Sequence, residues 1–184
     1  MTPRAGRLER LLPWACVAAA AVLFASELMI MFEFTPPGAE PIDNQSSGDR
    51  HGNAMFVIAA FAIAATFVAV WAGSRPAALG VATMGIIALL VFLLVDLPDA
   101  GQVGNLNDAR QSFVDAEAVP QSGFWLEMLG AIALAISGAA LATMSTEQLT
   151  ALRRRKRSEP SSTEEQAQAR SEDLKVPGRR ENQA

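Results

Sequence analysis

The chain has 184 residues, a formal net charge of −4 and a hydrophobic content of 51%, with one cysteine and one histidine. One cysteine excludes an intrachain disulfide and a zinc site of paired cysteines and histidines. The apolar residues lie in long blocks and the charged residues between them, which is typical of an integral membrane protein rather than of a soluble domain.

Four apolar blocks are long enough to cross a bilayer as helices. A helix rises 1.5 Å per residue, so about 20 residues cross the roughly 30 Å of hydrocarbon. The blocks lie at residues 11–32, 54–72, 77–97 and 124–144. We therefore predict an all-α membrane protein, an antiparallel bundle of four transmembrane helices over residues 11–144. Residues 1–10 form a short segment before it.

Two kinds of connection join these spans. The link from Gly73 to Pro76 is so short that the second and third helices must form an antiparallel hairpin, with Pro76 in the first turn of the third. The outer segments 33–53 and 98–123 are longer, and we expect a short helix over residues 107–116. Neither segment is large enough for a separate domain.

The distribution of cations predicts the orientation. Placing both termini in the cytoplasm leaves only Arg50 and Arg110 outside, in agreement with the positive-inside rule. The cations then placed inside are Arg4, Arg7, Arg10, Arg75, Arg153, Arg154, Arg155, Lys156, Arg157, Arg170, Lys175, Arg179 and Arg180.

The tail over residues 145–184 changes to Ser, Glu, Gln and Arg, a composition that predicts disorder beyond its first turns. Ser145 and Gln148 form a capping-box pattern, which predicts a brief surface helix. A basic run follows, made of Arg153, Arg154, Arg155, Lys156 and Arg157. We interpret this run first as a topology anchor, and second as a contact for anionic lipid headgroups.

Three acids, Glu27, Asp96 and Glu127, are each the only acid in their apolar block. All three fall in the outer leaflet, and an ionised carboxylate in lipid usually turns inward, pairs or lines a water-filled cavity. We therefore expect them to point between helices. Small residues spaced by four continue from Glu127, and we expect this stripe to be a packing face. It comprises Ala131, Ala135, Ala139 and Thr143.

The acids belong to an expected outer polar cluster, for which three interpretations stay open. The cluster comprises Glu27, Arg50, His51, Asp96, Asp99, Arg110 and Glu127. First, Arg50 and Arg110 pair with the acids and fasten the outer loops over the bundle. Second, the three intramembrane acids form a cation or proton site. Third, His51 and two carboxylates bind a metal, although their spacing matches no metal-site pattern, so no metal or cofactor is predicted.

Five short motifs carry a resemblance to known proteins. They are Thr35-Pro36-Pro37-Gly38, Asp49-Arg50-His51-Gly52, Gly73-Ser74-Arg75-Pro76, Asp96-Leu97-Pro98-Asp99 and Gly123-Phe124-Trp125-Leu126-Glu127. Through them the chain resembles uncharacterised bacterial four-helix inner-membrane proteins from Leu11 to about Leu149. The resemblance implies four spans and a location in the bacterial cytoplasmic membrane. It implies no activity, cofactor or catalytic residue.

The sequence contains no phosphate-binding loop, no nucleophile beside an activating base and no metalloprotease helix, so we do not expect an enzyme. An enzyme would need a pocket around His51, Asp96 and Glu127. The first expectation is an accessory or scaffold protein that contacts the bilayer and a second copy or another membrane protein, with no nucleic acid. The alternative is a small cation- or proton-linked transporter or channel subunit that uses the outer carboxylates.

Overall fold

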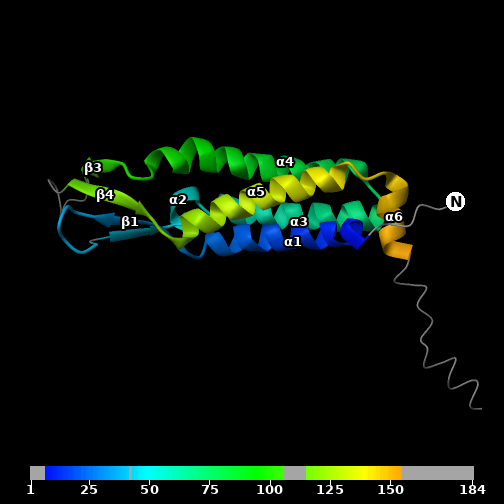
Figure 1. Cartoon of the computed structure of the whole chain (residues 1–184), viewed down its shortest axis with the longest axis horizontal. Coiled ribbons are helices and arrows are strands. Elements are labelled where there is room, and N and C mark those ends of the chain that lie inside the picture. The colour runs from blue at the N-terminus through cyan, green and yellow to red at the C-terminus, as the bar shows by residue number, and fades with distance from the viewer. Residues whose placement is uncertain (1–6, 42, 106–114, 155–184) are drawn as a thin grey trace, which may run out of the picture.

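Four long helices lie side by side in the computed structural model, which describes residues 7–41, 43–105 and 115–154 (Figure 1). They are α1 (Arg7–Ser26), α3 (Ala54–Ala72), α4 (Arg75–Val91) and α5 (Ser122–Ala142). After α4 the chain continues as a π-helical turn, η1 (Phe92–Asp96), and a 3-10 turn, η2 (Leu97–Asp99). Each of the four helical stretches is long and apolar enough to cross a membrane.

Helix α5 makes the most extensive contacts, with α4 on one side and α1 on the other. Glycines allow these helices to touch at their backbones. Gly85 of α4 faces α5 so closely that a Cβ atom there would lie 2.4 Å from the backbone nitrogen of Ala135. A Cβ on Gly130 of α5 would lie 2.9 Å from the backbone nitrogen of Leu23 in α1. Close packing of small residues thus holds the bundle together.

The expected stripe of small residues on α5 is only partly a packing face. Ala131 is buried, whereas Ala139 and Thr143 are exposed. Each step of four residues turns about 40° beyond a full helical turn, so three steps rotate the stripe by roughly 120°. The buried face instead follows three- and four-residue steps through Ala131, Leu134 and Gly138.

A four-stranded antiparallel sheet extends from one end of the bundle (Figure 1). Its strands are β1 (Ile30–Thr35), β2 (Asp43–Ser46), β3 (Val103–Asn105) and β4 (Asp115–Pro120), in the order β2-β1-β4-β3. Phe34 of β1 lies opposite Ala118 of β4, and Glu117 of β4 lies opposite Val103 of β3. The prediction of an all-α protein is therefore wrong at this end.

Two predicted helix boundaries are also wrong because of the sheet. The first span was expected to continue to residue 32, but α1 ends at Ser26 and the apolar run from Ile30 forms β1. A helix was expected over residues 107–116, but Asp115 and Ala116 belong to β4. The remainder of that helix, residues 107–114, lies outside the described residues.

Aromatic rings attach the sheet to the bundle. The ring of Phe124 in α5 packs in tilted contacts against Phe32 of β1 and Phe92 of η1, with centroids 5.6 Å and 4.8 Å from its own. All three side chains are buried. At the same junction the side-chain amide of Gln121 donates a 2.8 Å hydrogen bond to Glu33 of β1. The sheet is thus packed on the helix ends rather than tethered by loops alone.

The opposite end of the bundle holds α6 (Thr146–Arg154), which begins with the predicted capping box. The backbone nitrogen of Ser145 donates to the side chain of Gln148, and the backbone nitrogen of Gln148 donates to the Ser145 hydroxyl. Gln148 also donates to Glu9 of α1, which links α6 to that helix, while α6 packs mainly against α3. In the basic run, the backbone of Arg153 and Arg154 completes α6, whereas Arg155, Lys156 and Arg157 lie outside the described residues.

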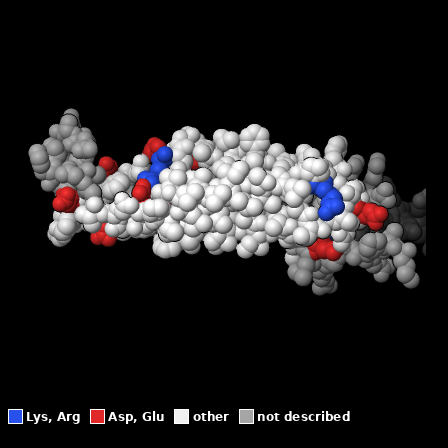
Figure 2. Space-filling model, turned by 90° about the horizontal axis from the view of Figure 1, so that it is seen from above, with Lys and Arg blue, Asp and Glu red and all other residues white. Residues whose placement is uncertain are grey.

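Charged side chains in the described part of the chain gather at the two ends of the molecule, and a broad uncharged belt separates them (Figure 2). Large apolar side chains are exposed along this belt, among them Phe61 at 62%, Phe67 at 67% and Ile136 at 66%. Such exposure in water would cost much free energy, whereas contact with lipid tails would not. The belt is therefore consistent with lipid contact in a multi-pass membrane protein.

Candidate functional site

A short helix, α2 (Ser47–His51), places polar side chains over the sheet end of the bundle. Ser46 caps its first turn by accepting a 3.1 Å hydrogen bond from the backbone nitrogen of Asp49. Gly52 ends the helix with a φ of 58°, a left-handed conformation that glycine adopts without strain. Within α2, Ser47, Arg50 and His51 are spaced by three and four residues, so they share one face of the helix.

Arg50 binds the end of the third span through several contacts. Its Nε atom lies 2.8 Å from Oδ1 of Asp96, and its Nη2 atom donates to the backbone carbonyl of Val95 at 3.1 Å. The same guanidinium group pairs with Asp99. It also lies 5.4 Å from the ring centroid of Phe32, a cation–π contact with β1.

These contacts explain how Asp96 and Asp99 are accommodated at the C-terminal end of the third span, where the helix dipole disfavours negative charge. Arg50 supplies the compensating cation from a different element. Partial burial opposes the charged guanidinium, but the hydrogen bonds and charges of Asp99 and Asp96 raise the pKa of Arg50 above its ordinary value. Arg50 is therefore a permanently charged clamp between α2 and the end of α4.

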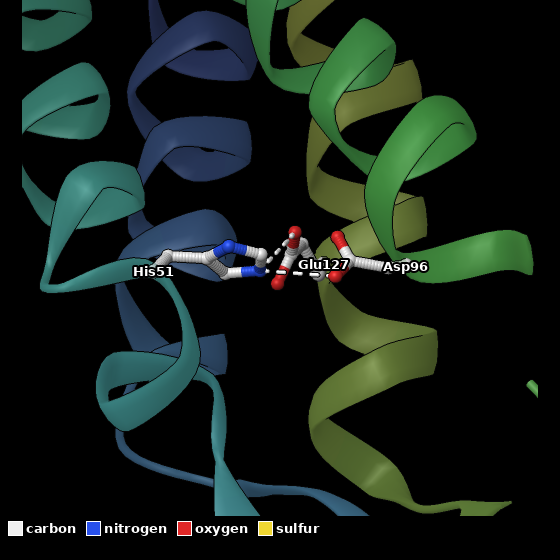
Figure 3. A group of neighbouring side chains, drawn as sticks. All are labelled: His51, Asp96 and Glu127. Carbon is white, nitrogen blue, oxygen red and sulfur yellow. Dashed lines mark ion pairs between the residues drawn. The ribbon is translucent and has the colours of Figure 1, made fainter. Parts of the chain in front are cut away.

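His51 points from α2 toward two fully buried carboxylates, Asp96 of η1 and Glu127 of α5 (Figure 3). Its Nε2 atom lies 3.2 Å from Oδ1 of Asp96 and 3.6 Å from Oε1 of Glu127. The other Glu127 oxygen, Oε2, accepts a 2.7 Å hydrogen bond from the Ser47 hydroxyl. Three separate elements thus converge on one small polar centre, which we call the His51 centre: His51, Asp96 and Glu127.

The charge state of His51 depends on these neighbours. Burial favours the neutral imidazole, but the close contact and charge of Asp96 and the charge of Glu127 outweigh burial and the repulsion from Arg50. Together they raise the pKa of His51 above its ordinary value of 6.5. His51 therefore holds a proton more tightly than a solvent-exposed histidine does.

Glu27 has a different role, which follows from its position just after α1. Its Oε1 atom accepts hydrogen bonds from the backbone nitrogens of Met55 at 2.7 Å and Phe56 at 3.3 Å. These are the second and third residues of α3, whose own N-cap residue, Asn53, makes no side-chain cap bond. Glu27 thus caps α3 from a distant part of the chain, where the helix dipole also favours its charge.

Four buried polar side-chain atoms in the described part of the chain have no hydrogen-bond partner. Three belong to the His51 centre: His51 Nε2, Asp96 Oδ2 and Glu127 Oε1. The fourth is Oε2 of Glu27. Buried polar atoms are paired in most proteins, because an unpaired one costs roughly 1–3 kcal/mol. Their concentration at one point marks this end of the bundle as the candidate site.

The structure brings together five residues of the expected cluster: Arg50, His51, Asp96, Asp99 and Glu127. Glu27 is buried at the same end of the bundle but binds the backbone of α3. Arg110 lies outside the described residues. Sequence reasoning did not identify Ser47, although the capping pattern of Ser46 and Asp49 predicts the short helix that presents it.

The centre has the donor groups of a cation site. Its imidazole nitrogen and carboxylate oxygens are acceptors that protons and metal ions share, and the ligand atoms of His51, Asp96 and Glu127 all lie within 4.8 Å of one another. In comparisons with protein-family models, with curated proteins and with solved structures, nothing matches this chain. The functional argument therefore rests on the geometry alone.

Proposed function

We propose that this protein is a non-enzymatic membrane accessory protein that displays its sheet to a partner protein in the same membrane. The observation that carries the proposal is the attachment of the sheet. Arg50, Ser47 and Glu27 join the segment over residues 27–53 to the ends of α4, α5 and α3, and the aromatic rings of Phe32 and Phe124 pack against each other at the same junction. A sheet that is held rigidly on the bundle can present a preformed binding surface to a partner, whereas a channel gate has to move.

The interior of the bundle supports an accessory role over a channel. Hydroxyl groups at mid-span positions bond to their own helices: Thr66 donates to the carbonyl of Ala62, and Ser137 donates to that of Ala133. Such bonds satisfy a hydroxyl without a polar pathway. Among the described residues, the buried carboxylates lie only at the sheet end of the bundle.

The charge of the sheet end indicates the chemistry of the partner. Five exposed acids cover it in the described part of the chain: Glu40, Asp43, Asp49, Asp115 and Glu117. The described cations there are Arg50, which is already paired, and the buried His51. A basic segment of a partner protein would complement this surface. By the positive-inside rule, we place the sheet outside the cytoplasm and α6 inside.

Site-specific photocrosslinking in cells tests this proposal. A photoreactive residue at Glu117 on the sheet should give a discrete crosslinked protein, whereas one at the exposed Phe61 should give mainly lipid adducts. In a chain that carries the Glu117 probe, Asp43→Asn with Asp115→Asn should weaken the crosslink. Glu147→Gln, an exposed acid on α6, is the matched control and should leave it unchanged. Equal crosslinking from Glu117 and Phe61, or no effect of charge, would contradict the proposal.

A cation- or proton-linked transporter or channel subunit is the second candidate, favoured by the unpartnered buried atoms of the His51 centre. Flux into proteoliposomes tests it. The natural chain is compared with the variant that carries Glu27→Gln, Asp96→Asn and Glu127→Gln, after both are shown to be folded. Flux that the variant lacks would favour transport over the accessory role. Absence of flux from both proteins would count against transport.

A further inference from the structure

We propose that the His51 centre binds one divalent transition-metal ion, with zinc the best fit, and that this ion joins α2 to the ends of α4 and α5. The proposal goes beyond the accessory role and does not depend on it. His51, Asp96 and Glu127 supply one nitrogen and two carboxylate oxygens, a mixed donor set that zinc accepts in sites with three protein ligands and one open position.

The distances fit a tetrahedral ion. Two ligand atoms that each lie about 2.1 Å from one ion, at the tetrahedral angle, are separated by about 3.4 Å. The Nε2 atom of His51 lies 3.2 Å from Oδ1 of Asp96, which also accepts from Nε of Arg50, and 3.6 Å from Oε1 of Glu127. Nε2 of His51 therefore already lies at ligand spacing from both carboxylates.

The unpartnered atoms are an independent reason to expect a ligand here. His51 Nε2, Asp96 Oδ2 and Glu127 Oε1 are buried without hydrogen-bond partners, and the His51 side chain is only 6% exposed. Figure 3 shows all three side chains directed at one another. One cation held by Nε2 of His51, Oε1 of Glu127 and a carboxylate oxygen of Asp96 would give the first two of these atoms a partner.

The surrounding contacts orient the carboxylates for this role. Ser47 holds Oε2 of Glu127, which leaves Oε1 directed to His51. Arg50 holds Oδ1 of Asp96, which leaves Oδ2 without a partner. Hydrogen bonds of this kind to the ligating carboxylates fix ligand geometry in metal sites.

The local charge also matches a divalent ion. Asp96, Asp99 and Glu127 contribute three negative charges and Arg50 contributes one positive charge, so two negative charges remain when His51 is neutral. A divalent cation balances them. Hard cations such as Mg²⁺ and Ca²⁺ prefer oxygen ligands throughout, so the imidazole favours zinc over them.

Equilibrium dialysis of the full chain tests the proposal. The protein is purified in detergent with its affinity tag removed, stripped with a chelator, and dialysed against Zn²⁺ at pH 7.5. We expect one Zn²⁺ per chain and at least tenfold weaker binding by His51→Gln. Because His51 is the only histidine in the chain, binding that depends on histidine cannot come from another site. Glu40→Gln, at an exposed acid outside the centre, is the control and should retain the ion.

A second measurement remains informative if a variant folds poorly. Co²⁺ bound to the natural chain should give the intense visible absorption of a four-coordinate site, and one equivalent of Zn²⁺ should abolish it. Absence of Zn²⁺ binding by the folded natural chain, or equal binding by a folded His51→Gln chain, would overturn the proposal. A weak, six-coordinate Co²⁺ spectrum would also overturn it, because it would indicate a solvated ion outside the centre.

Discussion

The hydroxyl of Ser47 donates a 2.7 Å hydrogen bond to the buried carboxylate of Glu127, 80 residues farther along the chain. One residue belongs to the short helix α2 and the other to the long helix α5, so the bond closes the outer segment over the bundle. It also means that the polar centre depends on the position of α2 as much as on the long helices.

Replacement of Ser47 by alanine should therefore destabilise the protein more than removal of an ordinary hydroxyl. The Glu127 oxygen would lose its donor in a buried place, at a cost of about 2 kcal/mol. Thr83→Val is the control, because that exposed hydroxyl bonds only to Leu79 in its own helix. Denaturant unfolding in detergent micelles measures both changes. Equal losses in the two variants would show that the Ser47 bond contributes nothing special.

Arg50→Gln should be more damaging, because it leaves Asp96 buried without its charged partner. Breaking one side of a buried ion pair costs roughly 3–5 kcal/mol. The exposed Arg75 provides a matched control, and Arg75→Gln should change the free energy of unfolding by less than about 0.5 kcal/mol. The same unfolding assay reads both variants. A loss for Arg50→Gln as small as that for Arg75→Gln would contradict the clamp.

The stability of the metal-free protein should depend on pH through His51. Its pKa is raised in the folded state by Asp96 and Glu127, against burial and the charge of Arg50. The protonated imidazole therefore stabilises the fold fully below its unfolded pKa of about 6.5, and this contribution disappears as pH rises through the folded value.

Melting temperatures in the presence of a chelator measure this effect. The natural chain should exceed His51→Gln most at pH 5.5, and the difference should shrink by pH 9. A difference that grows with pH would mean that the neutral imidazole is the stabilising form, which contradicts the predicted sign.

Substitution of two glycines on α4, Gly85 and Gly80, distinguishes the effect of close helix packing on stability from the effect of helix propensity. Gly85→Ala places a Cβ against the backbone of Ala135 and should cost several kcal/mol, because backbone cannot yield as a side chain can. The nearest atom to a Cβ on Gly80 is 3.9 Å away, so Gly80→Ala should be neutral or stabilising by about 1 kcal/mol. Thermal unfolding of both variants checks the contrast. A stable Gly85→Ala protein would mean that α4 and α5 are farther apart.

Paired cysteines test the register of the sheet. Thr35 lies opposite Glu117, and opposite residues in an antiparallel pair have the separation that a disulfide needs. In a Cys16→Ala background, Thr35→Cys with Glu117→Cys should crosslink efficiently on mild oxidation. Thr35→Cys with Asp115→Cys, shifted by two residues on β4, should crosslink much less. Gel mobility without reductant reports both, and preference for the shifted pair would indicate a different register.

Three of the four spans were predictable to within two residues when η1 and η2 are counted with α4, because an uninterrupted apolar block of that length has few alternatives to a membrane helix. The first span shows the limit of that reasoning. Ile30, Met31 and Phe32 continue the apolar run, yet they form a strand because β2 and β4 pair with them. High hydropathy indicates that a segment avoids water, but a short apolar run fits a helix and a strand equally well.

The sheet itself was hidden for a related reason. Strand β2 has the sequence Asp43-Asn44-Gln45-Ser46, with no alternation of apolar and polar residues and low β-propensity. Its pairing with β1 comes from tertiary context. The acids were recognisable because charge within an apolar block is rare, but the convergence of His51, Asp96 and Glu127 required the relative positions of three elements.

The cap that Glu27 provides for α3 also bears on the order of assembly. Translation produces Glu27 before Met55 and Phe56, so the acceptor for these backbone N–H groups exists before their helix does. Backbone N–H groups without a partner are costly in a membrane, so the first turn of α3 has all its hydrogen bonds only when Glu27 at the end of α1 lies beside it. We therefore expect α1 and α3 to associate as a pair during biosynthesis, before the hairpin of α3 and α4 closes the bundle.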